Sequence, residues 1–408
     1  MGVEFRARRQ RQNMQRLRAS FAFRLSSILL LGLLAAVAGP MAAQPAPLRV
    51  AIVGLVHGHV EGLLSALPQH KDFELVGIAD PDRALAEKYA KKYALAQSLF
   101  FTSMDTMMEA RHPQAVLVYT SIAGHRKVIE TAARYGVSVM VEKPLTISLE
   151  DALAIRKAAR EHHIHVLVNY ETTWYASNSA AYGEVESGLL GEIRRVVIHD
   201  GHQGPSEIGV PPEFLSWLTD PAQNGAGALY DFGCYGADLV TWLMHGEAPL
   251  TVTAVVNHDK PRLYPNVDDD ATIVLAYPHA QAVIQASWNW PFGRKDMEVY
   301  GATGYAITVG SDQLRVRHEH DAGEQVYTPP PLAGFEKDSL SYLRAVVTGY
   351  YTPFGDQDIR GFSGSQIRGM SKGELSSLDT NVVVMQILDA ARESARTGRS
   401  VRLTKPEE

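Results

Sequence analysis

The feature that most constrains this chain is a regular alternation of short apolar runs and helical patterns after residue 48. The apolar runs are rich in β-branched residues and lie at 49–54, 73–79, 116–120, 137–141 and 166–168. Because they are apolar on both faces, they are typical of strands in a parallel sheet. Helical patterns follow residue 59 and lie at 82–93, 124–135 and 148–162, the last with the capping pair Ser148 and Asp151. The alternation predicts an α/β fold with helices on both faces of the sheet.

The first strand-to-helix turn reads Gly54-Leu55-Val56-His57-Gly58-His59. A dinucleotide-binding turn needs glycines so that the backbone can approach the pyrophosphate; here the first is in place, Val56 takes the second position and Gly58 precedes the third. Asp80 follows after about twenty residues, where a carboxylate binds ribose hydroxyls. The negative charge of Asp80 would repel the 2′-phosphate of NADP and therefore favours NAD, although the nearby Arg83 is compatible with NADP. On these residues alone, a plain tight turn at Gly54 and an ordinary turn at Asp80 remain the alternative.

Three further segments carry a family resemblance. Thr120-Ser121-Ile122-Ala123-Gly124-His125 and Glu142-Lys143-Pro144 each follow a predicted strand, and residues 225–238 read G-A-G-A-L-Y-D-F-G-C-Y-G-A-D. In this order and spacing they resemble the Gfo/Idh/MocA family of NAD(P)-dependent oxidoreductases, over nearly all of the chain after residue 48. The resemblance implies an N-terminal Rossmann domain that binds NAD(P), followed by an α+β domain.

The resemblance also implies roles for single residues. Lys143 would lie beside the nicotinamide and the reacting carbon, and Asp231 would position the substrate or assist proton transfer. Tyr235 stands where many members have a His acid/base. A Tyr at this position resembles the glucose–fructose oxidoreductase and dihydrodiol dehydrogenase branches, in which Tyr takes that role. The chain departs from the family at the glycine turn, at Ser121-Ile122, and in lacking an Arg pair after Asn169-Tyr170.

The expected site residues fall into two overlapping groups, with no metal site among them. Those expected at the cofactor are Gly54, Val56, His57, Gly58, His59, Asp80, Thr120, Ser121, His125, Glu142 and Lys143. Those expected at the substrate are Lys143, Asn169, His202, Gln203, Asp231 and Tyr235.

The chemistry of hydride transfer explains why a Lys and a Tyr would be needed. A proton must leave or join the hydroxyl next to the reacting C–H bond. Desolvation beside Glu142 and the cofactor could lower the pKa of Lys143 towards neutrality, or Lys143 could polarise the oxygen electrostatically. A neighbouring Lys would lower the pKa of Tyr235, so the two predict a proton relay. The Lys143-Pro144 bond is permitted to be cis.

From about residue 169 the pattern changes. Helices are predicted at 178–187, 230–244 and 381–395, the last packing back on the first domain, and strands at 193–198, 250–256, 271–276, 282–289, 298–309 and 313–317. Strands without intervening helices predict an open, mainly antiparallel sheet with one face covered by helices. The other face, with Trp288 and Trp290, would be buried by a partner subunit, which predicts a homodimer or homotetramer.

Four other motifs receive structural interpretations. Cys234 is the single cysteine of the sequence, which excludes an internal disulfide framework, and it is expected to be a buried, inert thiol. His202 and Gln203 lie in a polar loop that either binds sugar hydroxyls or is simply solvated. The triad His162-His163-x-His165 is expected at the surface, and Asp268-Asp269-Asp270 is expected to form a solvated turn.

The N-terminus predicts export. Residues 1–24 carry a net charge of +6, and an uncharged, mainly apolar run of fourteen residues follows at 25–38. As a helix this run would span about 21 Å, less than the ~30 Å of a bilayer core, so residues 1–43 are predicted to be an export signal rather than a retained anchor. Arg8-Arg9 leaves the Sec and twin-arginine routes open. Since the whole chain carries −6, the remainder carries −12, which disfavours nucleic-acid binding.

Together these features predict three domains and one leading function. The predicted domains are the export signal at 1–43, a Rossmann domain at 44–168 and a substrate-binding, oligomerising domain at 169–408. The predicted function is a periplasmic or secreted oxidoreductase that transfers hydride between a sugar and a tightly held NAD, or NADP. The alternatives are an NAD-dependent glycosidase or lyase that uses transient oxidation, and a sugar-binding protein without turnover, against which Lys143 and Tyr235 argue.

Overall fold

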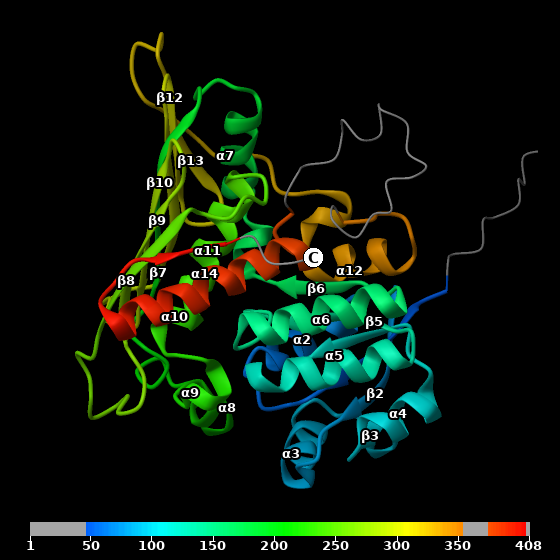
Figure 1. The fold of residues 1–408 in the computed structure, drawn as a ribbon. Coiled ribbons are helices and arrows are strands. Elements are labelled where there is room, and N and C mark those ends of the chain that lie inside the picture. The colour runs from blue at the N-terminus through cyan, green and yellow to red at the C-terminus, as the bar shows by residue number, and fades with distance from the viewer. Residues whose placement is uncertain (1–45, 354–373, 405–408) are drawn as a thin grey trace, which may run out of the picture. The chain divides into compact units, whose positions relative to one another are not determined.

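In the computed structural model, which describes residues 46–353 and 374–404, the alternating segment forms a six-stranded parallel sheet (Figure 1). The strand order is β3-β2-β1-β4-β5-β6, and every neighbouring pair is parallel. The strands are β1 (Leu48–Val53), β2 (Phe73–Ala79), β3 (Phe100–Phe101), β4 (Ala115–Val118), β5 (Ser138–Glu142) and β6 (Val166–Asn169). The predicted parallel sheet is therefore confirmed. The predicted export signal at 1–43 lies outside the described residues.

Helices cover both faces of this first sheet. They are α2 (Val60–Ala66), α3 (Arg83–Lys92), α4 (Met104–Arg111), α5 (His125–Arg134) and α6 (Leu149–His162). The predicted cap of α6 is confirmed, because the Ser148 side chain accepts a hydrogen bond from the backbone N–H of Asp151. A helix from far along the chain, α12 (Ser339–Val347), buries Leu340, Leu343 and Val346 in the same core as β1, a contact that the sequence did not predict.

The second sheet has nine strands in the order β14-β13-β12-β11-β7-β10-β9-β8-β15. They are β7 (Ile193–Gly201), β8 (Thr251–Asn257), β9 (Asp270–Ala276), β10 (Gln281–Ser287), β11 (Arg294–Gly301), β12 (Gly304–Val309), β13 (Gln313–His318), β14 (Gln325–Tyr327) and β15 (Val401–Arg402). Its pairs are antiparallel except β7 with β10, so the mainly antiparallel sheet is confirmed. The run predicted as one strand at 298–309 is instead a hairpin, because the chain turns between Gly301 and Gly304.

The remaining α-helices follow β6 in the chain. They are α7 (Ala176–Glu186), α8 (Pro212–Leu218), α9 (Pro221–Asn224), α10 (Ala228–Asp231), α11 (Gly233–Leu243) and α14 (Leu378–Thr397). The helix predicted at 230–244 is thus divided into α10 and α11 at Phe232. The prediction that the last helix packs back on the first domain is confirmed, since α14 contacts α6 and β6 as well as β8 (Figure 1). Among the described residues, no helix has the length and apolar character needed to cross a membrane.

The predicted position of Trp288 is wrong. The residue follows β10 and is fully buried on the helix-covered side, where its indole N–H donates to the Asp231 carboxylate. A buried indole N–H requires such a partner, and Asp231 supplies it. Trp290 is half-buried beside His199.

Candidate active site

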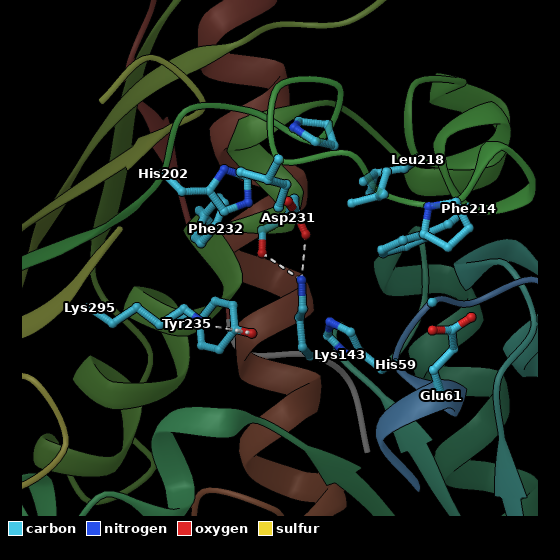
Figure 2. A pocket seen from close by; sticks show the side chains of 15 residues that line it. His59, Glu61, Lys143, His202, Phe214, Leu218, Asp231, Phe232, Tyr235 and Lys295 are labelled. Atoms are coloured by element: carbon cyan, nitrogen blue, oxygen red, sulfur yellow. Dashed lines mark hydrogen bonds and ion pairs between the residues drawn. The ribbon is translucent and has the colours of Figure 1, made fainter. Parts of the chain in front are cut away.

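One cavity, of about 290 Å³, is lined by segments of both sheets (Figure 2). Its polar end is formed by Lys143, His202, Asp231, Tyr235 and Lys295. An apolar wall opposite them comes from the loop before α8 and from α8 itself, and consists of Ile208, Val210, Pro211, Phe214 and Leu218. Gly58 and His59 of the first turn also line the cavity, together with Glu61, Pro205 and Phe232, so the cavity reaches from the dinucleotide turn to the second sheet.

A buried ion pair lies at the centre of the polar end. Lys143 follows β5 directly, its bond to Pro144 is cis as the sequence permitted, and its ammonium pairs with the carboxylate of Asp231 at the end of α10. The same ammonium donates to the Asp231 carbonyl at 3.0 Å, and the second carboxylate oxygen accepts the Trp288 indole N–H at 2.9 Å. Both side chains of the ion pair are less than a tenth exposed. The Asp231 carboxylate is therefore held at both oxygens.

Asp231 is foremost among the negative groups that act on Lys143. Burial alone would lower the pKa of Lys143, but these groups, with Glu142 among them, together outweigh burial and raise that pKa. The predicted lowering towards neutrality is therefore wrong, and Lys143 is a cation at neutral pH. Glu142 is engaged elsewhere, accepting from His59 Nδ1 at 2.9 Å and from the Asn169 amide at 3.0 Å.

Of the three consecutive aspartates, Asp268 supports the segment that carries this pair. Asp268 is buried and accepts hydrogen bonds from the backbone N–H groups of Gly227 and Leu229, at 2.9 and 2.7 Å, just before Asp231. A Cβ at Gly227 would lie 1.8 Å from the Asp268 carbonyl oxygen, so only glycine allows this approach. Asp269 is also buried and accepts from the backbone of Asp259 and Lys260. The predicted solvated turn is wrong, because two of the carboxylates satisfy buried backbone donors.

Tyr235 lies in the first turn of α11, fully buried beneath two lysines. The Lys143 ammonium is 5.1 Å from the centre of its ring, and the Lys295 ammonium is 4.5 Å from that centre and 3.4 Å from the hydroxyl (Figure 2). Burial raises the pKa of Tyr235 well above its usual value, and nearby carboxylates, Glu171 foremost, add to the rise. The predicted lowering of this pKa is wrong for the same reason.

Lys295 is a site residue that sequence reasoning missed. It lies on β11 directly opposite Asp200 of β7, and its ammonium pairs with Glu171, which follows β6. A lysine in an antiparallel strand ordinarily indicates a solvated face, so no local signal distinguished it. Only the pairing of β11 with β7 brings it to the cavity.

The structure separates the two predicted loop residues and places Asn169 outside the lining. His202 lines the cavity; its Nδ1 accepts from the Gly204 N–H at 2.8 Å, and burial lowers its pKa, so Nε2 carries the proton of a neutral ring. Gln203 is not among the lining residues, and its backbone carbonyl accepts a hydrogen bond from the Lys260 ammonium. Asn169 holds Glu142 and the Trp174 indole.

The first turn fits a dinucleotide in spite of its altered glycines. Gly54 has a φ of +87°, and a Cβ there would lie 2.6 Å from the backbone nitrogen of Thr120. Asp80 is buried at the end of β2, where its two oxygens accept the N–H groups of Leu55 and Asp82 at 2.7 and 2.8 Å. Each oxygen keeps a lone pair for a ribose hydroxyl. Val56, in the place of the second glycine, is half-buried and packs against the core.

Helices α8 and α9 close over this turn, which the sequence did not predict. The His57 ring is buried between Phe214 and Trp217, with ring centres 4.7 and 5.2 Å away, and the Trp217 indole donates to the Val56 carbonyl. Other expected cofactor residues also have contacts within the protein: Gly58 faces Phe214, Ser121 donates to Gln223, and His125 contacts the Leu145 carbonyl through Nδ1.

His57, His59 and Glu142 offer ligand atoms within 4.8 Å of one another, a grouping that the sequence pattern did not indicate.

Two further expectations concern the cysteine and the histidine cluster. Cys234 is buried and burial raises the pKa of its thiol, so the predicted inert thiol is confirmed. His162 and His163 are exposed and His165 is half-buried, in agreement with a surface position.

Comparison with known proteins now decides the family. Residues 48–170 match the model of the oxidoreductase family with an NAD-binding Rossmann fold, and residues 180–307 match the model of the GFO/IDH/MocA C-terminal domain. The chain belongs to the Gfo/Idh/MocA oxidoreductases. It is therefore an oxidoreductase, and NAD is its cofactor.

Relatives of this Gfo/Idh/MocA protein include enzymes named for sugars and for inositol. The chain is 24% identical to dTDP-3,4-didehydro-2,6-dideoxy-alpha-D-glucose 3-reductase of Streptomyces violaceoruber, over 85% of this chain and 95% of the relative. It is 27% identical to inositol 2-dehydrogenase of Rhizobium meliloti, over 69% and 79%. The solved structure of aldose-aldose oxidoreductase from Caulobacter crescentus has the same fold, with 22% identity, a TM-score of 0.70, and coverage of 88% of this chain and 100% of that one.

Proposed function

We propose that this Gfo/Idh/MocA protein transfers hydride between a hydroxyl or carbonyl group of a sugar, or sugar derivative, and the nicotinamide of NAD. The observation that carries the proposal is that the Lys143–Asp231 pair and the Tyr235 hydroxyl meet at one end of a cavity whose lining also includes the dinucleotide turn. The curated relatives named for sugar and inositol chemistry support the substrate class.

In this proposed hydride transfer, individual residues of the chain have distinct roles. The NAD would be held by the turn at 54–59 and by Asp80, and when bound it supplies the hydride acceptor or donor. The Lys143 ammonium, fixed by Asp231, orients and polarises the substrate oxygen. Tyr235 takes or returns the hydroxyl proton, and His202 donates from Nε2 to a neighbouring hydroxyl. The apolar wall excludes water from the opposite side of the cavity.

Export, cofactor retention and assembly belong to the same proposal. With residues 1–43 as an export signal, the protein would work in the periplasm or outside the cell, where no nicotinamide pool exchanges with it. We therefore propose that the cofactor stays bound and is regenerated in place, and that NAD rather than NADP is used because of Asp80. Across the open face of the second sheet, Val197, Val283 and Val274 form a half-buried apolar row, which supports a homodimer or homotetramer through this face.

The decisive experiment combines mass spectrometry with a substrate screen. Purified protein is gently denatured and its supernatant is searched for NAD and NADP, and the native protein is then mixed with mono- and disaccharides while nicotinamide absorbance is followed. We expect NAD to be released, an oxidised sugar to accumulate, and Lys143→Ala to lose turnover. Release of an aglycone without net redox change would instead indicate the glycosidase or lyase. A protein that binds sugars but shows neither change would be a binding protein.

A further inference from the structure

The two lysines of the cavity have different partners, and this difference assigns them different tasks. We propose that Lys295, held in place by Glu171, is the cation that stabilises the phenolate of Tyr235, whereas Lys143 is committed to Asp231. The inference rests on the proposed function only in giving Tyr235 a proton to carry. Lys295 is thus a positioning residue that acts through Tyr235, and none of the sequence motifs includes it.

The contacts distinguish the two lysines directly. The Lys295 ammonium is the closer of the two to the ring centre, at 4.5 against 5.1 Å, and it lies 3.4 Å from the Tyr235 oxygen. The Lys143 ammonium spends two of its hydrogen bonds on the carboxylate and the carbonyl of Asp231 (Figure 2). Both lysines have a carboxylate partner, but the Glu171 side chain is largely exposed and screened by water, whereas that of Asp231 is buried. The Lys295 cation, 3.4 Å from the Tyr235 oxygen, therefore stabilises a developing phenolate more than the Lys143 cation does.

Several other acidic groups near Tyr235 have partners of their own. Asp231 is paired with Lys143, and Glu142 contacts His59 Nδ1 and accepts from the Asn169 amide. Burial raises the pKa of Asp200 and Asp238 well above the usual value.

Neither the Asp200 nor the Asp238 carboxyl has a hydrogen-bond partner among the described residues, so burial favours the protonated, neutral form of both. Asp200 lies directly across the strand pair from Lys295, and in its neutral form it does not cancel the charge of that lysine. Burial also keeps the thiol of Cys234 neutral by raising its pKa. Among the charges around Tyr235, the Lys295 ammonium contacts its hydroxyl and favours the phenolate, whereas the Glu171 carboxylate is foremost among the acidic groups that oppose it.

The proton balance of the step is simple. When a sugar hydroxyl is deprotonated, its O–H bond breaks and its proton joins the phenolate oxygen of Tyr235, which becomes the neutral phenol. The reverse step returns the same proton. Lys295 keeps its own protons throughout and contributes only charge and a hydrogen bond.

The two members of one ion pair give a test with opposite signs. In the purified full chain, Tyr235 is replaced by a polyfluorinated tyrosine, whose phenol is more acidic, and its titration is followed by fluorine NMR. Lys295→Met removes the cation, so the titration midpoint should rise by about 1 to 3 pH units. Glu171→Gln removes the opposing carboxylate, whose side chain is 58% exposed, so the midpoint should fall by less than about one unit. Lys295→Arg keeps the charge, so the titration midpoint of this variant should stay close to that of the chain in which Lys295 is unchanged.

A purely structural role for the pair predicts a different result. Loss of either partner would then disturb the site alike, and both variants would move the midpoint in the same direction or leave it in place; either result overturns the inference. Because this titration needs no sugar, it stands or falls separately from the proposed function. If a substrate is found, the same shift should appear in the pH profile of kcat, with a smaller change in KM.

Discussion

The two lysine–carboxylate pairs of the cavity show how differently burial makes similar chemistry behave. In the Lys143–Asp231 region both side chains are under a tenth exposed, and the ammonium and indole donors are satisfied by the Asp231 carboxylate and its backbone carbonyl. In the Lys295–Glu171 region the lysine side chain is 19% exposed and that of Glu171 is 58% exposed. A buried charge that loses its partner has no water to replace it, whereas an exposed charge does. The first pair therefore supports both fold and site, and the second can tune charge at little cost in stability.

The largest difference in stability between the two regions should appear when the lysine of each pair is replaced by methionine. Lys143→Met leaves the Asp231 carboxylate buried without its cation, so we expect a loss of about 3–5 kcal/mol in the free energy of unfolding and at least about a 100-fold loss of turnover. Lys295→Met should cost less than about 1 kcal/mol of stability. Urea unfolding of the two variants measures both. Equal losses of stability would remove the contrast between the regions.

The next effect concerns the backbone behind the buried pair. Asp268→Ala removes the acceptor of two buried N–H groups, those of Gly227 and Leu229, and should lower stability by about 2–3 kcal/mol. Asp270→Ala, at a half-buried position of the same acidic run, is the matched control and should change stability by less than about 1 kcal/mol. Unfolding midpoints measure the difference. A tolerant Asp268→Ala would mean that α10 holds its shape without this carboxylate.

A smaller effect should follow from removing one hydrogen bond on each side. Trp288→Phe deprives the Asp231 carboxylate of its indole donor and should cost about 1.5–3 kcal/mol, since the bond is made to a buried charge. Tyr175→Phe removes the corresponding donor to the Glu171 carboxylate, 2.6 Å away on the open side, and should cost less than about 1 kcal/mol. Differential scanning calorimetry compares the two. If Tyr175→Phe proves the more costly, exposure is not what separates the pairs.

The smallest effect lies at the extremes of pH. The pKa of Asp231 is lowered on folding, so its contribution is present above its ordinary value of 3.8 and is lost as the pH falls through the lower folded value. The pKa of Lys143 is raised, so its contribution is complete below 10.5 and is lost as the pH rises through the higher folded value. The free energy of unfolding, measured across pH, should decline at both ends, and the Lys143→Met, Asp231→Asn double variant should flatten both declines. A double variant with unchanged declines would assign them to other groups.

The first sheet could be predicted because its signals are local. Apolar runs between helical patterns mark β1, β2, β4, β5 and β6, whereas β3 has only Phe100 and Phe101 and is too short to show a period. The second sheet was predicted less well. Gly301 and Gly304 mark the turn between β11 and β12, and the run was still interpreted as one strand.

The candidate site divides in the same way. Lys143, Asp231 and Tyr235 stand in segments with a recognisable spacing, and they do line one cavity. Lys295, Trp288 and Asp268 have no such spacing, because each reaches the site through strand pairing or a bend in the chain. The helices that cover the dinucleotide turn, through Phe214 and Trp217, were missed for the same reason.

The sequence by itself determined the parallel sheet, the family and the residues of the motifs, because periodicity and motif spacing are properties of neighbouring residues. Only the tertiary structure decided which charges face each other and how much water reaches them. The pKa values of Lys143 and Tyr235 show the consequence, since both shift in the direction opposite to the one predicted from the sequence. Burial and long-range ion pairs set those shifts, and neither depends on how far apart two residues lie along the chain.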